Sequence, residues 1–390
     1  MLMHHNGQDY EVAASAAATE ARAKFEAQIE RGRSRTAQVI EQINTQVPLD
    51  RVVPAKALKF SVEGEEIQVT FPDRDRTQEG FHRHAVGQAA ARAEIPLVYI
   101  DKLMSKGEWG RQLVAENLNQ VYANSNPKTR ILTRSVMHEV RGFLSDAYRR
   151  LDSRPIVDEF IQAAMSFGAI PLDGFALQTK IAIKAVLPMV FEPVPHEVLI
   201  FGVALENSDF GNGALSLRTF MERLWCTNRA ISSEDLRKIH LGARLGEDLH
   251  LSQRTYELDT QTMASAANDI VVRSLSAESV NGFLETIKKA NEEKIEPHRI
   301  NEFLKRHLSK EEAGKVIEAY NSPEIEMLPP GNTVYRMSNA ISWIANGVED
   351  EDRKLELMKV AGLVMDPKSR SARAALPGPV INAEMDAVLA

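Results

Sequence analysis

The sequence has little cysteine and no long apolar run, and each shortage removes a class of protein. Its single cysteine, Cys226, has no partner for an internal disulfide, so we expect a reducing compartment, the cytoplasm. No stretch reaches the roughly 18–20 apolar residues that span a bilayer, and no segment has the apolar core of a secretory signal. We therefore expect no membrane partner.

Recognisable catalytic motifs are also missing. The sequence has neither the GxxxxGK[ST] loop that cradles phosphates nor the HExxH pattern of zinc hydrolases. Gly211 and Gly213 lie in a turn sequence, and His82 and His84 are two positions apart, which on a helix directs them to different sides. We therefore expect no cofactor and no metal, and no residue can be assigned a catalytic role.

The composition is that of a globular protein that builds its own core. Hydrophobic residues make up 44% of the chain and charged residues 26%, so neither a disulfide nor a metal is needed for folding. The formal net charge of −7 argues against a protein that coats nucleic acid through its overall charge. A local basic face remains compatible with that total.

The hydrophobic pattern predicts an α+β fold. Residues 58–71 alternate apolar and polar side chains around Glu63-Gly64-Glu65, which is typical of a β-hairpin. Alternation returns over 175–226 and predicts a three-strand antiparallel meander. Helical spacing dominates at the start of the chain and after about Met263. We expect an antiparallel sheet of hairpins and a meander packed by helices, with a helical N-terminal arm and a helical C-terminal region.

Changes in pattern along the chain suggest four parts. We expect an N-terminal helical arm over 1–50, an α+β core domain over 51–290, a C-terminal helical region over 291–365 and a flexible tail over 366–390.

Basic residues concentrate between Pro127 and Arg154. This stretch holds seven basic and three acidic residues, a local excess of +4 in an acidic chain. Cations on an adjoining sheet face would extend the patch, and phosphates are attracted to such a surface. Tyr148 is an aromatic residue well placed to stack on a base. The candidate nucleic-acid-binding residues are Arg141, Arg149, Arg150, Lys180, Lys184, Arg218 and Tyr148.

Three segments in residues 80–270 carry recognisable signatures. They are AARAEIPLVYIDKL, RGFLSDAYRRLD and GVALENSDFGNGALSLRTFMERLWCTN. In this order they resemble the phage/plasmid-like family known as domain of unknown function nine-three-two. The chain departs from the third signature at Asn228-Arg229, where a Gly commonly follows the Asn. The resemblance implies a phage or plasmid setting rather than an activity.

The expected order of three antiparallel strands and a long helix is also similar to the core of annealing proteins of the Rad fifty-two and Red-beta type. That similarity implies a homo-oligomer that binds single-stranded DNA in recombination or replication. Two alternatives stay open: a metal-dependent nuclease using Asp146, Asp152 and Glu206, and a non-catalytic structural or adaptor protein of a mobile element.

Overall fold

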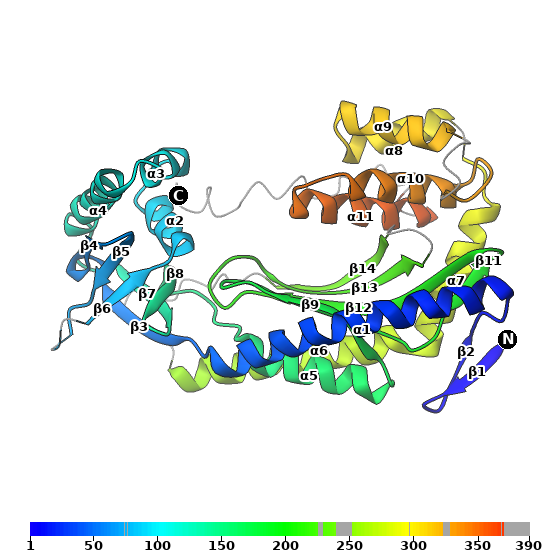
Figure 1. The fold of residues 1–390 in the computed structure, drawn as a ribbon, viewed down its shortest axis with the longest axis horizontal. Coiled ribbons are helices and arrows are strands. Elements are labelled where there is room, and N and C mark those ends of the chain that lie inside the picture. The colour runs from blue at the N-terminus through cyan, green and yellow to red at the C-terminus, as the bar shows by residue number, and fades with distance from the viewer. Residues whose placement is uncertain are drawn as a thin grey trace.

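The computed structural model describes the chain except residues 74, 76, 225–228, 239–251, 296, 323–327, 368 and 370–390. Cys226 and most of the expected tail over 366–390 lie outside the described residues. Within them the chain forms two lobes, a small one over 49–145 and a large one built from the rest (Figure 1).

The small lobe is a six-stranded sheet with helices on one face. Its strand order is β3-β7-β8-β6-β5-β4, antiparallel except for the β6–β8 pair. The expected hairpin is β4–β5, which turns at Gly64 with a positive φ of 60°. The element bounds are β3 (Leu49–Pro54), β4 (Lys59–Glu63), β5 (Glu66–Thr70), β6 (Gln78–Phe81), β7 (Arg130–Val136), β8 (Glu139–Ser145), the 3₁₀ turn Ala55–Ala57, α2 (Arg83–Arg92), α3 (Leu97–Met104) and α4 (Glu108–Ala123).

The large lobe is organised around a second antiparallel sheet, of order β14-β13-β12-β10-β9, with β11 paired to β12. Its central strand β12 is long and mostly apolar on both faces, which is the pattern of a strand covered on both sides. The strand bounds are β9 (Ile170–Ala176), β10 (Ile181–Val186), β11 (Phe191–Val194), β12 (Glu197–Asn207), β13 (Leu215–Arg223) and β14 (Arg229–Lys238).

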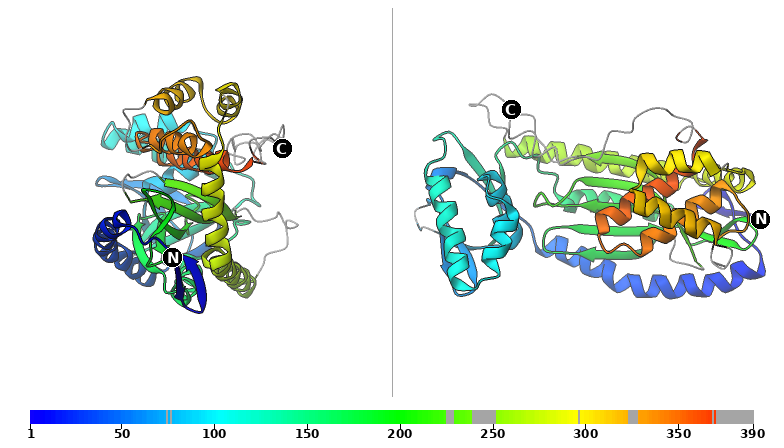
Figure 2. Two further views of the ribbon diagram at one scale, coloured as in Figure 1. Left: turned by 90° about the vertical axis from the view of Figure 1, so that its right-hand side faces the viewer. Right: turned by 90° about the horizontal axis from the view of Figure 1, so that it is seen from above.

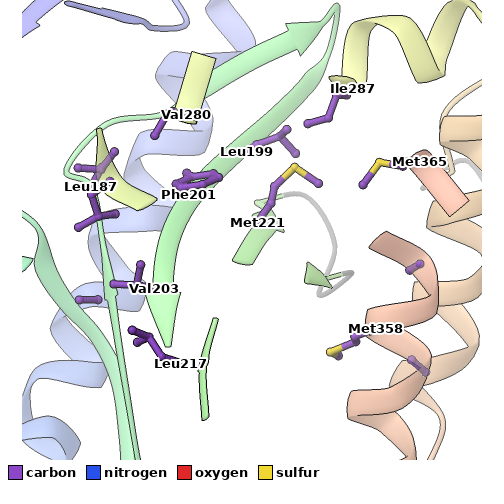
Figure 3. Packing of buried hydrophobic residues seen from close by; sticks show 14 of the residues in the cluster. Leu187, Leu199, Phe201, Val203, Leu217, Met221, Val280, Ile287, Met358 and Met365 are labelled. Carbon is purple, nitrogen blue, oxygen red and sulfur yellow. The ribbon is translucent and has the colours of Figure 1, made fainter. Parts of the chain in front are cut away.

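Helices cover the two faces of this sheet. Leu199, Phe201 and Val203 point into a core shared with the helices that follow the sheet, where Met358 and Met365 also lie (Figure 3). The opposite face of β12 packs against the start of α1. The helix bounds are α1 (Ala16–Thr45), α5 (Ser153–Ser166), α6 (Gln253–Leu275), α7 (Ala277–Glu292), α8 (Pro297–His307), α9 (Lys310–Asn321), α10 (Val334–Asn346) and α11 (Glu351–Met365).

Helix α1 runs along the large lobe and ends at the small lobe (Figure 2). It packs closely on β9: a Cβ added to Gly32 would lie 1.6 Å from the carbonyl oxygen of Leu172. Only glycine allows this approach of helix to strand. A short hairpin, β1 (Leu2–His5) and β2 (Gln8–Glu11), precedes α1, and the Tyr10 hydroxyl donates to the carbonyl of Leu275.

The two lobes have separate hydrophobic cores. One buried cluster lies wholly within residues 55–143, whereas the large sheet and the C-terminal helices share another. The expected core domain over 51–290 therefore contains parts of two cores, and the helices over 291–365 belong to the large lobe rather than to a region of their own. The coarser expectation, a mixed α/β protein with antiparallel sheets and a helical C-terminal region, is confirmed.

Candidate functional site

Two polar connecting segments meet at the junction of the lobes. The first is the connection over 146–152, which joins β8 to α5. The second is the turn over 208–213 between β12 and β13. Their polar side chains form one buried network.

Arg134 on β7 is the centre of this network. Its side chain is 1% exposed. Its Nε lies 2.7 Å from Asp50 Oδ1, its Nη2 lies 2.5 Å from Asp152 Oδ1, and its Nη1 donates to the carbonyl oxygen of Asp209 at 2.8 Å. Each terminal nitrogen thus has an oxygen partner, which is the condition for burying a guanidinium group. Arg134 connects β3, the start of α5 and the second turn.

Asp209 is held against the start of α5. Its Oδ1 accepts from the backbone N–H and the hydroxyl of Ser153, both at 2.7 Å. Asn207 donates to the same hydroxyl and to the carbonyl of Leu151. Burial raises the pKa of Asp209 to about 6, although the positive charge of Arg134 acts in the opposite direction. The turn and α5 are therefore fixed to one another by a carboxylate that titrates near neutrality.

The same turn inserts into the small lobe. The carbonyl oxygen of Phe210 accepts from His84 Nε2 at 3.1 Å and from Gln88 Nε2 at 2.9 Å, both on α2. Gln88 also accepts from the backbone N–H of Phe143 at 2.8 Å. Gly211, with a φ of +75°, has no room for a Cβ, which would lie 2.7 Å from Leu144. Burial lowers the pKa of His84, which favours its neutral form at this contact.

Four of the seven predicted binding residues belong to this junction and are engaged within the protein. Arg149 pairs with Asp259 on α6. Arg141 pairs with Glu139 at 2.9 Å and donates to Gln46 and to the carbonyl of Gln178.

Arg150 and Tyr148 are the other two. Arg150 lies 3.3 Å from Asp50 and over the ring of Tyr256. Tyr148 is 7% exposed and packs with Leu132 and Leu144. In this structure these side chains are engaged at the junction instead of forming a water-facing strip. Asp259 and Asp50, from distant segments, neutralise Arg149 and Arg150, and Glu139 of the same strand neutralises Arg141.

The remaining three predicted residues share one face of the large sheet. Lys184, Ala204 and Arg218 follow one another across β10, β12 and β13. Glu206 is on the same face, with Lys180 3.2 Å from its Oε2 and Arg218 at its Oε1. Two cations therefore bind this carboxylate, and Lys184 is the cross-strand neighbour of Asp173 on β9. The Lys180 side chain is 24% exposed, whereas Arg218 is 3% exposed and lies beneath it.

The carboxylates of the nuclease alternative are not assembled. Asp152 binds Arg134, and Glu206 binds Lys180 and Arg218. Among the described residues, no group of three or more His, Cys, Asp or Glu side chains could hold a metal ion. A small cavity of about 20 Å³ beside Asp209 is large enough for one water molecule. In the part of the chain that the structure describes, no helix is long and apolar enough to cross a bilayer.

Sequence reasoning missed the residues at the centre of the junction. Arg134 was counted in the basic stretch but not selected, and Asp50 and Asp209 were not connected to it. Their separations along the chain, 84 residues for Asp50 and 75 for Asp209, hide the contacts. The available signal for a long-range contact was Ser208-Asp209 beside the glycines of the turn, but Ser and Asp at such positions usually cap the turn locally.

The pKa of Asp209 leads to a pH-dependent stability. Because its folded-state pKa, about 6, exceeds the usual 3.8, protonation favours the folded form. The contribution is fully present below the unfolded pKa and is lost as pH rises through about 6. From about pH 7.5 to about pH 5 we expect the native chain to gain about 1 kcal/mol of unfolding free energy relative to Asp209→Asn. Urea unfolding at both pH values measures this difference.

The Asn variant keeps the oxygen that accepts from Ser153, so its fold should persist. Asp158→Asn, at an exposed position on α5, serves as the control and should follow the native pH profile. Parallel profiles for native and Asp209→Asn would show that this carboxylate is ionised equally in both states.

Comparison of the chain with models of protein families, with curated proteins and with solved structures finds no match to any of them.

Proposed function

We propose that this chain is a non-catalytic protein that binds single-stranded DNA and acts as a homo-oligomer in recombination or replication of a phage or plasmid. The observation that supports binding is the row of cations on the large sheet. Lys180, Lys184 and Arg218 share this face with Glu206 and with Asp173, which is the cross-strand neighbour of Lys184 and the ion-pair partner of Arg35. Among these residues, four cations stand against two carboxylates. Phosphates are attracted to a locally positive surface even on a chain of net negative charge.

The three cations would attract phosphates in two ways, by direct contact and by charge at a distance. Lys180 and Lys184 are partly exposed and would meet the phosphates directly. Arg218 is buried and bound to Glu206. Its positive charge would attract the phosphates through the electric field, which is screened less in a low-dielectric surrounding than in water. Glu206 is the competing anion in this arrangement, because its two oxygens occupy the cations that a phosphate would use.

Removing that competing charge is the test of the site. Glu206→Gln keeps an oxygen acceptor for Arg218 but leaves the row one positive charge stronger. We expect its affinity for a labelled oligothymidylate to rise roughly threefold to tenfold at about 50 mM salt, with a steeper salt dependence. Fluorescence anisotropy titrations over a range of salt concentrations measure both quantities.

Glu285→Gln is the matched control, because it makes the same charge change on α7 at an exposed ion pair with Lys288. It should leave the affinity close to native. An equal rise in both variants would assign the effect to net charge, and no rise in Glu206→Gln would remove this face from the site.

An adaptor that binds another protein is the second candidate. Apolar side chains are exposed on α3 and α4, with Val98 at 66% and Trp109 at 58%. Apolar groups at such exposure mark protein contacts when they form a patch. The oligonucleotide titration separates the candidates, since an adaptor would show no nucleic-acid affinity at about 50 mM salt.

A further inference from the structure

The lobes are joined by polar contacts rather than by a common core. Each has its own buried apolar cluster, and the apolar contact at the junction is the small group Leu132, Leu144, Tyr148 and Val52. Interfaces of this polar kind between two independent cores commonly allow the domains to move relative to one another. The chain passes between the lobes at 46–48, after α1, and at 146–152.

The turn over 208–213 bridges these lobes without being part of either chain connection. On the large-lobe side, the hydroxyl of Ser208 donates to the carbonyl of Thr179 and accepts from two amides of the turn. On the small-lobe side, the turn is held by the α2 donors to the Phe210 carbonyl and by Arg134 at the carbonyl of Asp209. Gln178 also contacts the small lobe, at His82 and through its carbonyl at Arg141. Both sets of contacts are polar and can be broken without opening either core.

We propose that the turn over 208–213 is a releasable latch, and that the lobes rotate about the connections at 46–48 and 146–152 when it leaves the small lobe. Its seat in the small lobe is closely packed. A Cβ at Gly211 would lie 2.7 Å from Leu144 Cδ2 and 2.8 Å from Gln88 Nε2, so these two small-lobe side chains would have to shift.

Two glycines of the same turn provide a matched pair of variants. Gly211 and Gly213 both have positive φ, at +75° and +124°, so alanine strains the backbone at either position. Only Gly211→Ala pushes against the small lobe, because the nearest atom to a Cβ at Gly213 is Lys180 Cε of the large lobe, at 3.9 Å. Gln88→Ala is a second opening variant, which removes a donor to Phe210 without straining the turn.

The distance between spin labels on the two lobes shows whether the latch is closed or released. Labels are attached to Glu116→Cys on α4 and Gln162→Cys on α5, both exposed positions, in a full-length Cys226→Ser chain, and pulsed double electron–electron resonance gives the distance distribution. We expect one narrow peak for the native turn and for Gly213→Ala. Gly211→Ala should raise the ratio of open to closed molecules by roughly 5- to 30-fold, and Gln88→Ala should raise it in the same direction.

Two results would overturn the latch. The first is an unchanged narrow peak in both Gly211→Ala and Gln88→Ala, which would make the lobes one rigid body. The second is equal broadening in Gly213→Ala, which would assign the effect to turn strain instead of release from the small lobe. Circular dichroism of each labelled variant verifies that both lobes remain folded.

Discussion

Arg134→Met is expected to lower the free energy of unfolding by about 3–5 kcal/mol. The substitution removes the partner of Asp152 and the donor to the Asp209 carbonyl, and it leaves Asp50 with Arg150 alone. Removing one member of a buried ionic network is costly, because the groups that stay buried, here the turn around Asp209, lose their compensating charge. Urea unfolding followed by circular dichroism and by tryptophan fluorescence measures the loss.

Arg154→Ala is the matched control, because Arg154 is an exposed arginine at the start of α5, two residues from Asp152. It should change stability by no more than about 0.5 kcal/mol. A loss below about 1 kcal/mol for Arg134→Met would contradict the account of the junction, since water would then be replacing the guanidinium group at little cost.

Gly32→Ala is expected to destabilise the protein by about 2–3 kcal/mol, against the usual preference of a helix for alanine. The added Cβ would lie 1.6 Å from the Leu172 carbonyl oxygen and 2.5 Å from its carbon. These are backbone atoms of β9, so neither a rotamer change nor a side-chain shift can make room. Helix α1 would have to move away from the sheet, and thermal unfolding should show the loss.

Gly282→Ala on α7 gives the opposite expectation from the same chemical change. No heavy atom lies within 4 Å of a Cβ built there, so alanine should stabilise by about 0.5–1 kcal/mol. If both variants shifted stability in the same direction, the close packing of α1 on β9 would not be the determinant at Gly32.

The local pattern of the sequence carried much of the secondary structure. Strict alternation around Gly64 predicted the β4–β5 hairpin, and the helical spacing of Val280, Leu284 and Ile287 predicted α7. The division into lobes was not predictable. Both cores are built from ordinary apolar patterns, and only the tertiary contacts of the folded chain show which residues share a core. The close approach at Gly32 was equally hidden, since a glycine inside a helical pattern carries no sign of what lies opposite.

The shared face of Lys180, Lys184 and Arg218 was predictable in part. The alternation of 177–185 placed Lys180 and Lys184 on one face, and the pairing of β12 with β13 brings Arg218 to the same row. The basic stretch over 127–154 was misleading as a measure of exposed charge. Asp259, which neutralises Arg149, is 110 residues away along the chain, and a local count of charges does not include it. Net charge in a window describes composition, whereas phosphate binding requires accessible cations.

Size-exclusion chromatography with light scattering measures assembly and binding of single-stranded DNA together. The full chain is run at about 50 mM salt with and without a labelled oligothymidylate. An assembled DNA-binding protein should elute as a particle of at least twice 43.5 kDa that carries the label at low salt but not at about 0.5 M. A monomer, or a particle that elutes free of label at about 50 mM salt, would rule this function out.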